Sequence, residues 1–247
     1  MLAQLISMQT DDFKCLLWQA DCRDVLPKLP LASVDGIIAD PPFGIGFKYN
    51  SHDDDPTEYI EWLWPVLEQC ERVCKPGSPL FVYQALPNIK QFAKWFPRDW
   101  RMIAAAKNFV QMRKGSVMQY SWDPVLVWWT PGKTYTKATK NRDFHLSNQA
   151  SKVSDPSRPE RKHPCPRPID QVMHFVSQWI RPGGVVLDPF MGSGTTGVAC
   201  HRLGMGFIGI EKDESYYKIA SARIRKETSR ILVSAKRWTV KEERVSS

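Results

Sequence analysis

The sequence contains no stretch approaching the roughly 18–20 consecutive apolar residues that a membrane-spanning helix needs. Its first residues carry no basic segment ahead of their apolar positions, so a secretory leader is not indicated. Repeats and low-complexity tracts are absent, and 14 glycines and 19 prolines in 247 residues are too few for a collagen-like or disordered chain. We therefore expect a single domain over residues 1–247, in the cytoplasm, without a membrane partner.

The six cysteines form no C-x-x-C pair and have no histidine partners at zinc-binding spacing. Scattered cysteines of this kind predict reduced thiols rather than a disulfide framework. No metal site is predicted.

Positive charge is concentrated in one segment. The chain has a formal net charge of +8, and residues 131–168 hold nine basic residues against three acidic ones. This segment is poor in aliphatic residues and lacks both helical and strand periodicity, so it predicts an irregular basic insertion that binds a polyanion. The alternative is a solvated surface loop. The candidate contacts are Lys133, Lys137, Lys140, Arg142, Lys152, Arg158 and Arg161.

Strand-like and helix-like segments alternate on both sides of this insertion. Apolar runs predict strands at 13–20, 34–39, 79–83, 101–109, 118–130, 185–188 and 206–210. Helical spacing predicts helices at 58–74, 88–96, 169–180, 195–203 and 214–228. Pro124 indicates that the strand containing it lies at a sheet edge. The alternation predicts an α/β fold whose mostly parallel sheet is covered by helices on both faces.

A glycine motif, Asp188-Pro-Phe-Met-Gly-Ser-Gly-Thr-Thr-Gly197, lies between a predicted strand and a predicted helix. Its glycines satisfy G-x-G-x-x-G, and Glu211 ends the next strand, where a carboxylate can hold ribose hydroxyls. A P-loop is excluded because no lysine follows the glycines. Asp188 precedes the glycines and would repel a diphosphate, so the motif favours a ligand with an ammonium and a sulfonium, S-adenosylmethionine.

A second motif, Asp40-Pro41-Pro42-Phe43, directly follows a predicted strand. Two successive prolines fix the backbone φ angles, and they offer carbonyl acceptors but no N–H donors. The Asp40 carboxylate and the Pro41 carbonyl can grip an exocyclic amino group, while Phe43 stacks on the ring that bears it. An ordinary turn is the structural alternative.

Together these motifs resemble the S-adenosylmethionine-dependent DNA amino-methyltransferases of the permuted β group, which methylate adenine N6 or cytosine N4. The resemblance covers about residues 12–228 and includes the order of the parts: catalytic motif, basic target-recognition insertion (131–168), cofactor motif. It implies a three-layer Rossmann-like methyltransferase sheet, mostly parallel with an antiparallel edge, in a circularly permuted order. It also implies double-stranded DNA as substrate in a bacterial or phage-infected cell, allows a homodimer, and is compatible with a restriction-modification or phage enzyme.

Residue by residue, the resemblance implies catalytic roles for Asp40, Pro41, Pro42 and Phe43. The implied cofactor residues are Asp21, Cys22, Asp188, Phe190, Gly192, Ser193, Gly194, Thr195 and Glu211. The family's Gly-Asp-Cys segment has Ala20 in place of glycine, and His163-Pro-Cys-Pro-Arg-Pro168 departs from the family's His-Pro-Thr-x-Lys-Pro at Cys165 and Arg167.

The predicted activity is methyl transfer from S-adenosylmethionine to N6 of an adenine flipped out of duplex DNA. Cytosine N4 is the alternative base, although the cytosine enzymes of this group favour serine where this chain has Asp40. A dinucleotide-dependent oxidoreductase, a methyltransferase acting on RNA or on protein glutamine, and a DNA-binding protein without catalysis are the other hypotheses.

Overall fold

The computed structural model of the protein describes residues 3–9, 14–44, 58–94, 99–111, 117, 120–137, 141–147, 167–232 and 239–245. These residues build one ten-stranded sheet in the order β10-β1-β2-β9-β8-β3-β4-β6-β5-β7. The strands are β1 (Ala3–Gln9), β2 (Lys14–Gln19), β3 (Gly36–Ala39), β4 (Pro79–Tyr83), β5 (Arg101–Gln111), β6 (Tyr120–Trp129), β7 (Phe144–Ser147), β8 (Val185–Asp188), β9 (Gly206–Glu211) and β10 (Thr239–Val245).

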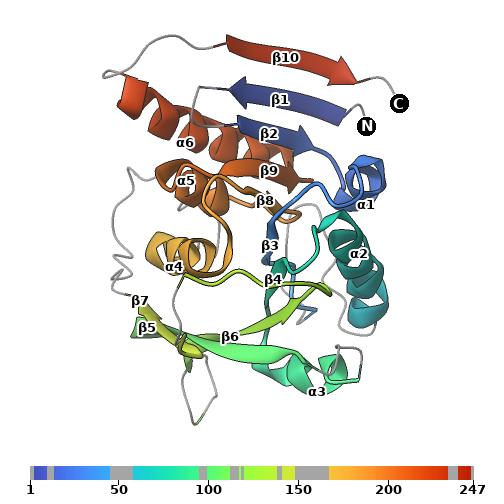
Figure 1. The fold of residues 1–247 in the computed structure, drawn as a ribbon, viewed down its shortest axis with the longest axis vertical. Helices are drawn as coiled ribbons and strands as arrows, with labels where there is room; N and C mark the ends of the chain where they lie inside the picture. Colours follow the sequence, from blue (N-terminus) through green and yellow to red (C-terminus); the bar gives the residue numbers. More distant parts are fainter. Residues whose placement is uncertain are drawn as a thin grey trace.

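Helices cover both faces of this sheet (Figure 1). They are α1 (Cys22–Val25), α2 (Tyr59–Val73), α3 (Ile89–Phe92), α4 (Ile169–Trp179), α5 (Thr195–Arg202) and α6 (Glu214–Leu232), with short 3₁₀ turns at Leu26–Lys28 and Leu86–Asn88. The five strands from β2 to β4 run parallel, and β1 and β6 run antiparallel to their neighbours. The predicted three-layer, mostly parallel sheet with an antiparallel edge is confirmed.

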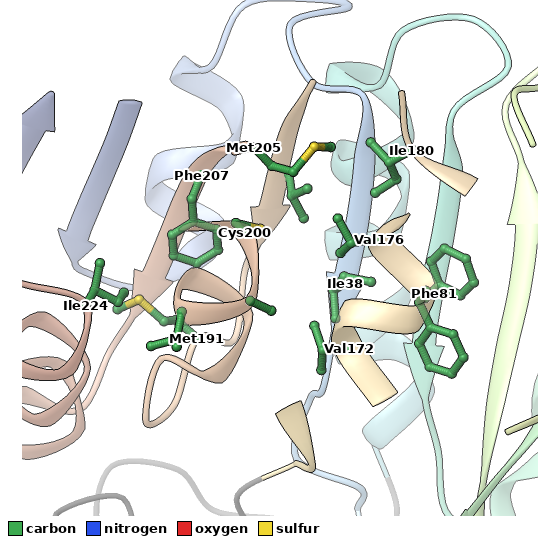
Figure 2. Packing of buried hydrophobic residues seen from close by; sticks show 14 of the residues in the cluster. Ile38, Phe81, Val172, Val176, Ile180, Met191, Cys200, Met205, Phe207 and Ile224 are labelled. Atoms are coloured by element: carbon green, nitrogen blue, oxygen red, sulfur yellow. The ribbon is translucent and has the colours of Figure 1, made fainter. Parts of the chain in front are cut away.

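Each face of the sheet has its own buried apolar layer. On one face α4, α5 and α6 pack on the strands, and Figure 2 shows Val172 and Val176 of α4 beside Phe81 of β4 and Ile38 of β3. On the other face, apolar residues of α1, α2 and α3 form a second buried cluster with the strands, in which Leu63 of α2 is fully buried. Apolar residues recur along α2 and α4 at helical spacing because only one stripe of each helix faces the sheet.

Five cysteines are buried as free thiols, distributed over both layers. Cys15 and Cys200 lie in the α4–α6 layer, whereas Cys22, Cys70 and Cys74 lie in the α1–α3 layer. Burial raises the pKa of each of these thiols, to about 12 for Cys22. Among the described residues no group of three or more possible metal ligands occurs.

The prediction that the Pro124 strand lies at an edge is wrong. Strand β6 lies inside the sheet, between β4 and β5. Pro124 is tolerated there because β4 ends at Tyr83, paired with Val125, and the Gln84 amide donates to the Pro124 carbonyl at 3.0 Å. The missing N–H of Pro124 therefore falls where the β4–β6 ladder ends.

Three strands were not predicted. Strand β7 lies within the segment predicted to be irregular, and it pairs in parallel with β5. Strands β1 and β10 pair with each other antiparallel at the opposite edge, next to β2. The last helix also extends to Leu232 rather than 228, and the short helix predicted at 88–96 ends at Phe92. In the part of the chain that the structure describes, no helix is long and apolar enough to cross a membrane.

Candidate active site

The carboxyl ends of the parallel strands bring both sequence motifs to one edge of the sheet. Asp40 follows β3, Asp188 ends β8 and Glu211 ends β9, and these three strands are neighbours. After β3 the chain crosses through α2 to β4, and after β8 it crosses through α5 to β9, on the other face and in the other direction. The point between β3 and β8 is therefore a topological switch point, where open α/β sheets bind ligands.

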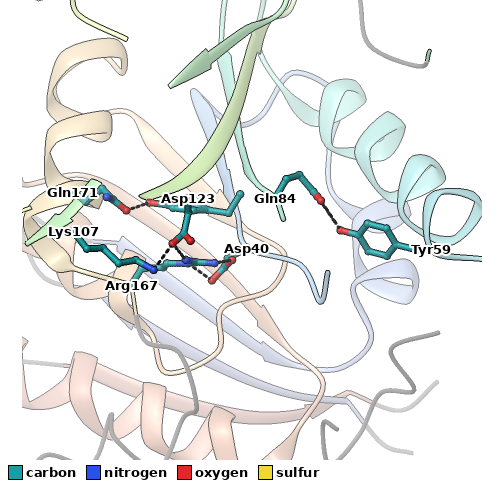
Figure 3. Close-up of polar contacts among 8 residues, drawn as sticks. Asp40, Tyr59, Gln84, Lys107, Asp123, Arg167 and Gln171 are labelled. Atoms are coloured by element: carbon teal, nitrogen blue, oxygen red, sulfur yellow. Dashed lines mark hydrogen bonds and ion pairs between the residues drawn. The ribbon is translucent and has the colours of Figure 1, made fainter. Parts of the chain in front are cut away.

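The turn that follows β3 is held by side chains from α2 and from the segment just after β4. The carbonyl of Phe43 accepts a hydrogen bond from Asn88 Nδ2 at 2.5 Å. Gly44 has a φ of +61° and lies against the ring of Tyr59, where a Cβ would clash. The Tyr59 hydroxyl in turn exchanges hydrogen bonds with the amide of Gln84, at 2.8 and 3.2 Å (Figure 3). This network fixes the backbone that carries Asp40 and Phe43.

The carboxylate of Asp40 is bound by an arginine that sequence reasoning did not assign to the active site. Arg167 Nε lies 2.7 Å from Asp40 Oδ2, and Arg167 Nη2 lies 2.6 Å from Asp40 Oδ1 (Figure 3). One signal could have found it. The helix that precedes a parallel strand runs antiparallel to that strand, so the residue just before α4 must lie at the carboxyl edge, beside the Asp40 turn.

The glycine loop after β8 is braced by the two carboxylates at the strand ends. Asp188 accepts from the Phe190 amide at 3.0 Å and from Thr196 Oγ1 at 2.6 Å. Glu211 accepts from the Gly192 amide at 2.7 Å. Sequence reasoning assigned both acids to a ligand, whereas their contacts here also shape the loop that would receive it.

Burial raises the pKa of Asp188 to about 7 and that of Glu211 to about 7, because an ionised carboxylate loses its hydration there. The hydrogen bonds from Thr196 and from the loop amides oppose this effect without overcoming it. Two buried acids that carry raised pKa values at a switch point are typical of a ligand site.

The start of α5 is fixed from the opposite helix. Arg223 of α6 donates to Ser193, both to its carbonyl and, at 3.0 Å, to its hydroxyl. Gly194 has a φ of +81°, and a Cβ there would meet Ala220 of α6 at 2.9 Å. Thr195 begins the helix and is buried. Glycine at 194 is thus required by backbone conformation and helix packing, as well as by any ligand.

The segment after β2 lies beside Glu211, because Gln19 pairs with Glu211. Asp21 caps α1 through the Arg23 amide at 3.0 Å and also binds the Arg23 guanidinium. These contacts hold the pKa of Asp21 below its usual range against the effect of burial. Cys22 is packed in the α1–α3 layer, so its thiol is a core group.

Two buried donors near these strand ends have no hydrogen-bond partner among the described residues: Trp18 Nε1 and Gln171 Nε2. Trp18 lies on β2, one residue before the Gln19–Glu211 pair, and Gln171 lies in the first turn of α4. Trp18 packs in the α1–α3 layer, whereas Gln171 belongs to α4 on the other face of the sheet. The carboxylates at these strand ends suit a cationic ligand with hydroxyl groups, such as S-adenosylmethionine, and suit a polyphosphate poorly.

The structure does not bring the described basic candidates of the insertion to this edge. Lys133 lies against Gly77, just before β4 begins, and the Lys137 amide bonds the Gln178 carbonyl near the end of α4. Arg142 precedes β7 at its amino end. All three are exposed and lie at the amino ends of the parallel strands, whereas the candidate site lies at their carboxyl ends. Lys140, Lys152, Arg158 and Arg161 lie outside the described residues.

Comparison with known proteins agrees with the geometry. A family model described as DNA methylase (N6/N4 methyltransferase) matches residues 34–222. The chain is 27% identical over 238 residues to the DNA adenine methyltransferase YhdJ of Escherichia coli, covering 83% of this chain and 80% of that protein. It is 26% identical over 225 residues to the type II methyltransferase M.HpaI of Haemophilus parainfluenzae, covering 82% and 71% respectively.

Among solved structures, the M1.HpyAVI–SAM complex superposes with a TM-score of 0.64 at 24% identity, over 85% of this chain and 98% of that one. At that identity the likeness concerns the fold. The family match spans most of the chain and includes both the Asp40 turn and the glycine loop, so the chain belongs to the DNA methylase family of N6 and N4 amino-methyltransferases.

Proposed function

We propose that the protein transfers a methyl group from S-adenosylmethionine to N6 of an adenine in double-stranded DNA. The observation that carries this function is that the Asp40–Phe43 turn, the glycine loop after β8 and Glu211 all lie at the switch point of the sheet. YhdJ, the relative named a DNA adenine methyltransferase, supports adenine as the target. Cytosine N4 is the second candidate, because the family model covers both kinds of enzyme.

The residues of the Asp40 turn act on the target amino group. The lone pair of that nitrogen is delocalised into the ring, so it is a poor nucleophile. Acceptance of its two N–H bonds by the Asp40 carboxylate and the Pro41 carbonyl draws the nitrogen toward a tetrahedral geometry, and Pro42 keeps this turn rigid. Phe43 stacks on the flipped base and offsets about 1–3 kcal/mol of the unstacking cost.

S-adenosylmethionine, when bound, supplies an electrophilic methyl group on a cationic sulfur. The amino nitrogen uses its lone pair for the new N–C bond, the electrons of the broken C–S bond stay on sulfur, and one amino proton leaves to solvent. We assign Asp188, Glu211 and the Phe190–Thr195 loop to holding the donor, and Asp21 and Cys22 to the neighbouring end of its site. The proposed steps require no metal ion.

The test is methyl transfer from tritiated S-adenosylmethionine to DNA, followed by nucleoside chromatography. We expect the label to elute as N6-methyladenine. A label eluting as N4-methylcytosine would replace the base and keep the mechanism, whereas no label in DNA would overturn the function.

We expect the double-stranded DNA to contact the part of the basic insertion nearest the site. Arg161 precedes Arg167 by only six residues in the sequence, and Arg167 binds Asp40 of the catalytic turn. Charge reversal of Arg158 and Arg161 should weaken DNA binding and reduce the salt slope by about 0.9 for each lost phosphate contact.

The matched control reverses Lys133 and Lys137, which lie at the amino ends of the parallel strands. Affinity is measured by fluorescence anisotropy from low to moderate salt. If the control pair flattens the slope as much as Arg158 and Arg161 do, the DNA does not approach from the Asp40 edge.

Three further properties are proposed: the place of the reaction, its biological role and the oligomeric state. The reaction would take place in the cytoplasm of a bacterium or of a phage-infected cell, where the DNA is. A type II restriction-modification role follows the name of M.HpaI. The protein would act as a monomer or as a homodimer, which light scattering with and without DNA distinguishes.

A further inference from the structure

Arg167 joins Asp123 to Asp40 within a row of four largely buried charged side chains. Its Nε and Nη2 atoms bind the two oxygens of Asp40, and its Nη1 atom lies 2.5 Å from Asp123 Oδ2. Lys107 Nζ lies 2.6 Å from the same Asp123 oxygen. The four side chains are between 11% and 22% exposed, and their charges balance. Figure 3 shows the row running from Lys107 through Asp123 and Arg167 to Asp40.

The guanidinium of Arg167 lies over two aromatic rings. Its central carbon lies 4.4 Å from the centroid of the Tyr83 ring and 5.4 Å from that of Phe43. The Tyr83 hydroxyl donates to Gln171 Oε1 at 2.8 Å, which fixes the ring beneath Arg167. Burial alone would lower the pKa of Arg167, but Asp40 and Asp123 outweigh this effect and raise it, so the group stays charged.

The bonding pattern leaves Asp40 able to accept further hydrogen bonds. Each carboxylate oxygen has two acceptor positions, and the guanidinium occupies one on each oxygen. The remaining positions are those that an incoming amino group can use. A planar fork that binds both oxygens also prevents rotation of the carboxylate, which a single ammonium group would not do.

We propose that Arg167 is a positioning residue for methyl transfer: it holds the Asp40 carboxylate at the angle from which it accepts the target amino group, and Asp123 holds Arg167. This inference rests on the proposed function. It assigns Arg167, one of the two positions at which the chain departs from the family's His-Pro-Thr-x-Lys-Pro motif, to the catalytic turn. It also makes the residue that closes the basic insertion a direct partner of Asp40.

The experiment compares Arg167→Gln, Arg167→Lys and Asp123→Asn with wild type in single-turnover methylation, at saturating S-adenosylmethionine and DNA. Displacement of a reacting group by about 1 Å can cost on the order of 100-fold in rate, so we expect Arg167→Gln to be about 10- to 100-fold slower. Arg167→Lys should recover part of the rate. Affinities for cofactor and for DNA should stay within about twofold of wild type, so that the effect falls on the rate and not on binding.

Two measurements separate positioning from a merely structural ion pair. The loss in Asp123→Asn should vanish when Arg167 is already Gln, because Asp123 acts through Arg167. Methylguanidinium added to Arg167→Ala should restore part of the single-turnover rate. The matched control is Arg202→Gln, which breaks the Arg202–Glu227 pair (2.6 Å) between α5 and α6 and should leave the rate unchanged.

Wild-type rates in Arg167→Gln would overturn the inference while leaving the proposed function intact. So would a loss that methylguanidinium does not reverse and that follows the fall in melting temperature. Failure of the wild-type protein to methylate DNA would instead overturn the proposed function, and the two failures are therefore distinguishable.

Discussion

Replacement of Asp40 by Asn or Ala is expected to abolish methyl transfer. The carboxylate makes its decisive contact with the amino group in the transition state, and loss of one such electrostatic contact lowers kcat by on the order of 100- to 1000-fold. In Asp40→Asn the amide would also present N–H groups toward the amino N–H groups of the base. Affinities for S-adenosylmethionine and DNA should change little. The measurement is tritiated methyl transfer under single-turnover conditions.

The structure adds a condition to this experiment. Asp40 neutralises Arg167, so its removal leaves a positive charge with only Asp123 as acidic partner, beside Lys107. Removing one partner of a fully buried pair costs about 3–5 kcal/mol, and the remaining Asp123 contact makes the cost smaller here. Thermal unfolding of each variant therefore accompanies the assay. Substantial activity in a folded Asp40→Ala protein would contradict the mechanism.

Replacement of Glu211 by Gln, or of Asp188 by Asn, is expected to weaken S-adenosylmethionine binding by about 1.5–3 kcal/mol. Each change removes a charge that a cationic or hydroxyl-bearing ligand would meet. Each also disturbs the loop, because Glu211 accepts from the Gly192 amide and Asp188 accepts from the Phe190 amide. Isothermal titration calorimetry measures the loss. Wild-type affinity in both variants would contradict the assignment of the loop.

The same carboxylates predict how binding depends on pH. Their pKa values of about 7 mean that the free protein holds protons at these sites below pH 7, although an ordinary carboxyl group would have lost them. A ligand that favours the ionised form releases these protons. Affinity should therefore rise with pH up to about 7 and then level off. Calorimetry in two buffers of different ionisation enthalpy counts the protons, and their number should fall in Glu211→Gln.

The central strands of the fold were predictable because their amino-acid composition reflects their burial. Strands such as Ile37–Ile38 and Val186–Leu187 are buried on both faces, so they read as continuous apolar runs between turn residues. Strand β10 could not be recognised in this way, since its sequence contains Lys-Glu-Glu-Arg and its pairing with β1 makes it a strand. Strand β6 was assigned correctly as a strand but was placed at the wrong position by the rule for proline.

The residues of the candidate site likewise fall into those that the sequence predicts and those that it does not. Asp40, Asp188 and Glu211 could be selected because each ends an apolar strand, and the parallel sheet then brings them to one edge. Arg167 and Asp123 end no apolar strand. The position of Arg167 just before α4 places it near the Asp40 turn, but its pairing with the Asp40 carboxylate and with Asp123 depends on side-chain contacts that only the three-dimensional structure shows.

The buried cysteines can serve as chemical probes of local opening of the protein. A thiol reacts with an alkylating reagent only when it is both exposed and ionised, and these five are neither. Because Cys15 and Cys200 belong to one helical layer and Cys22, Cys70 and Cys74 to the other, alkylation followed by peptide mass mapping reports on the two layers separately. Differences between the two sets of alkylation rates would show which of the two helical layers opens more readily.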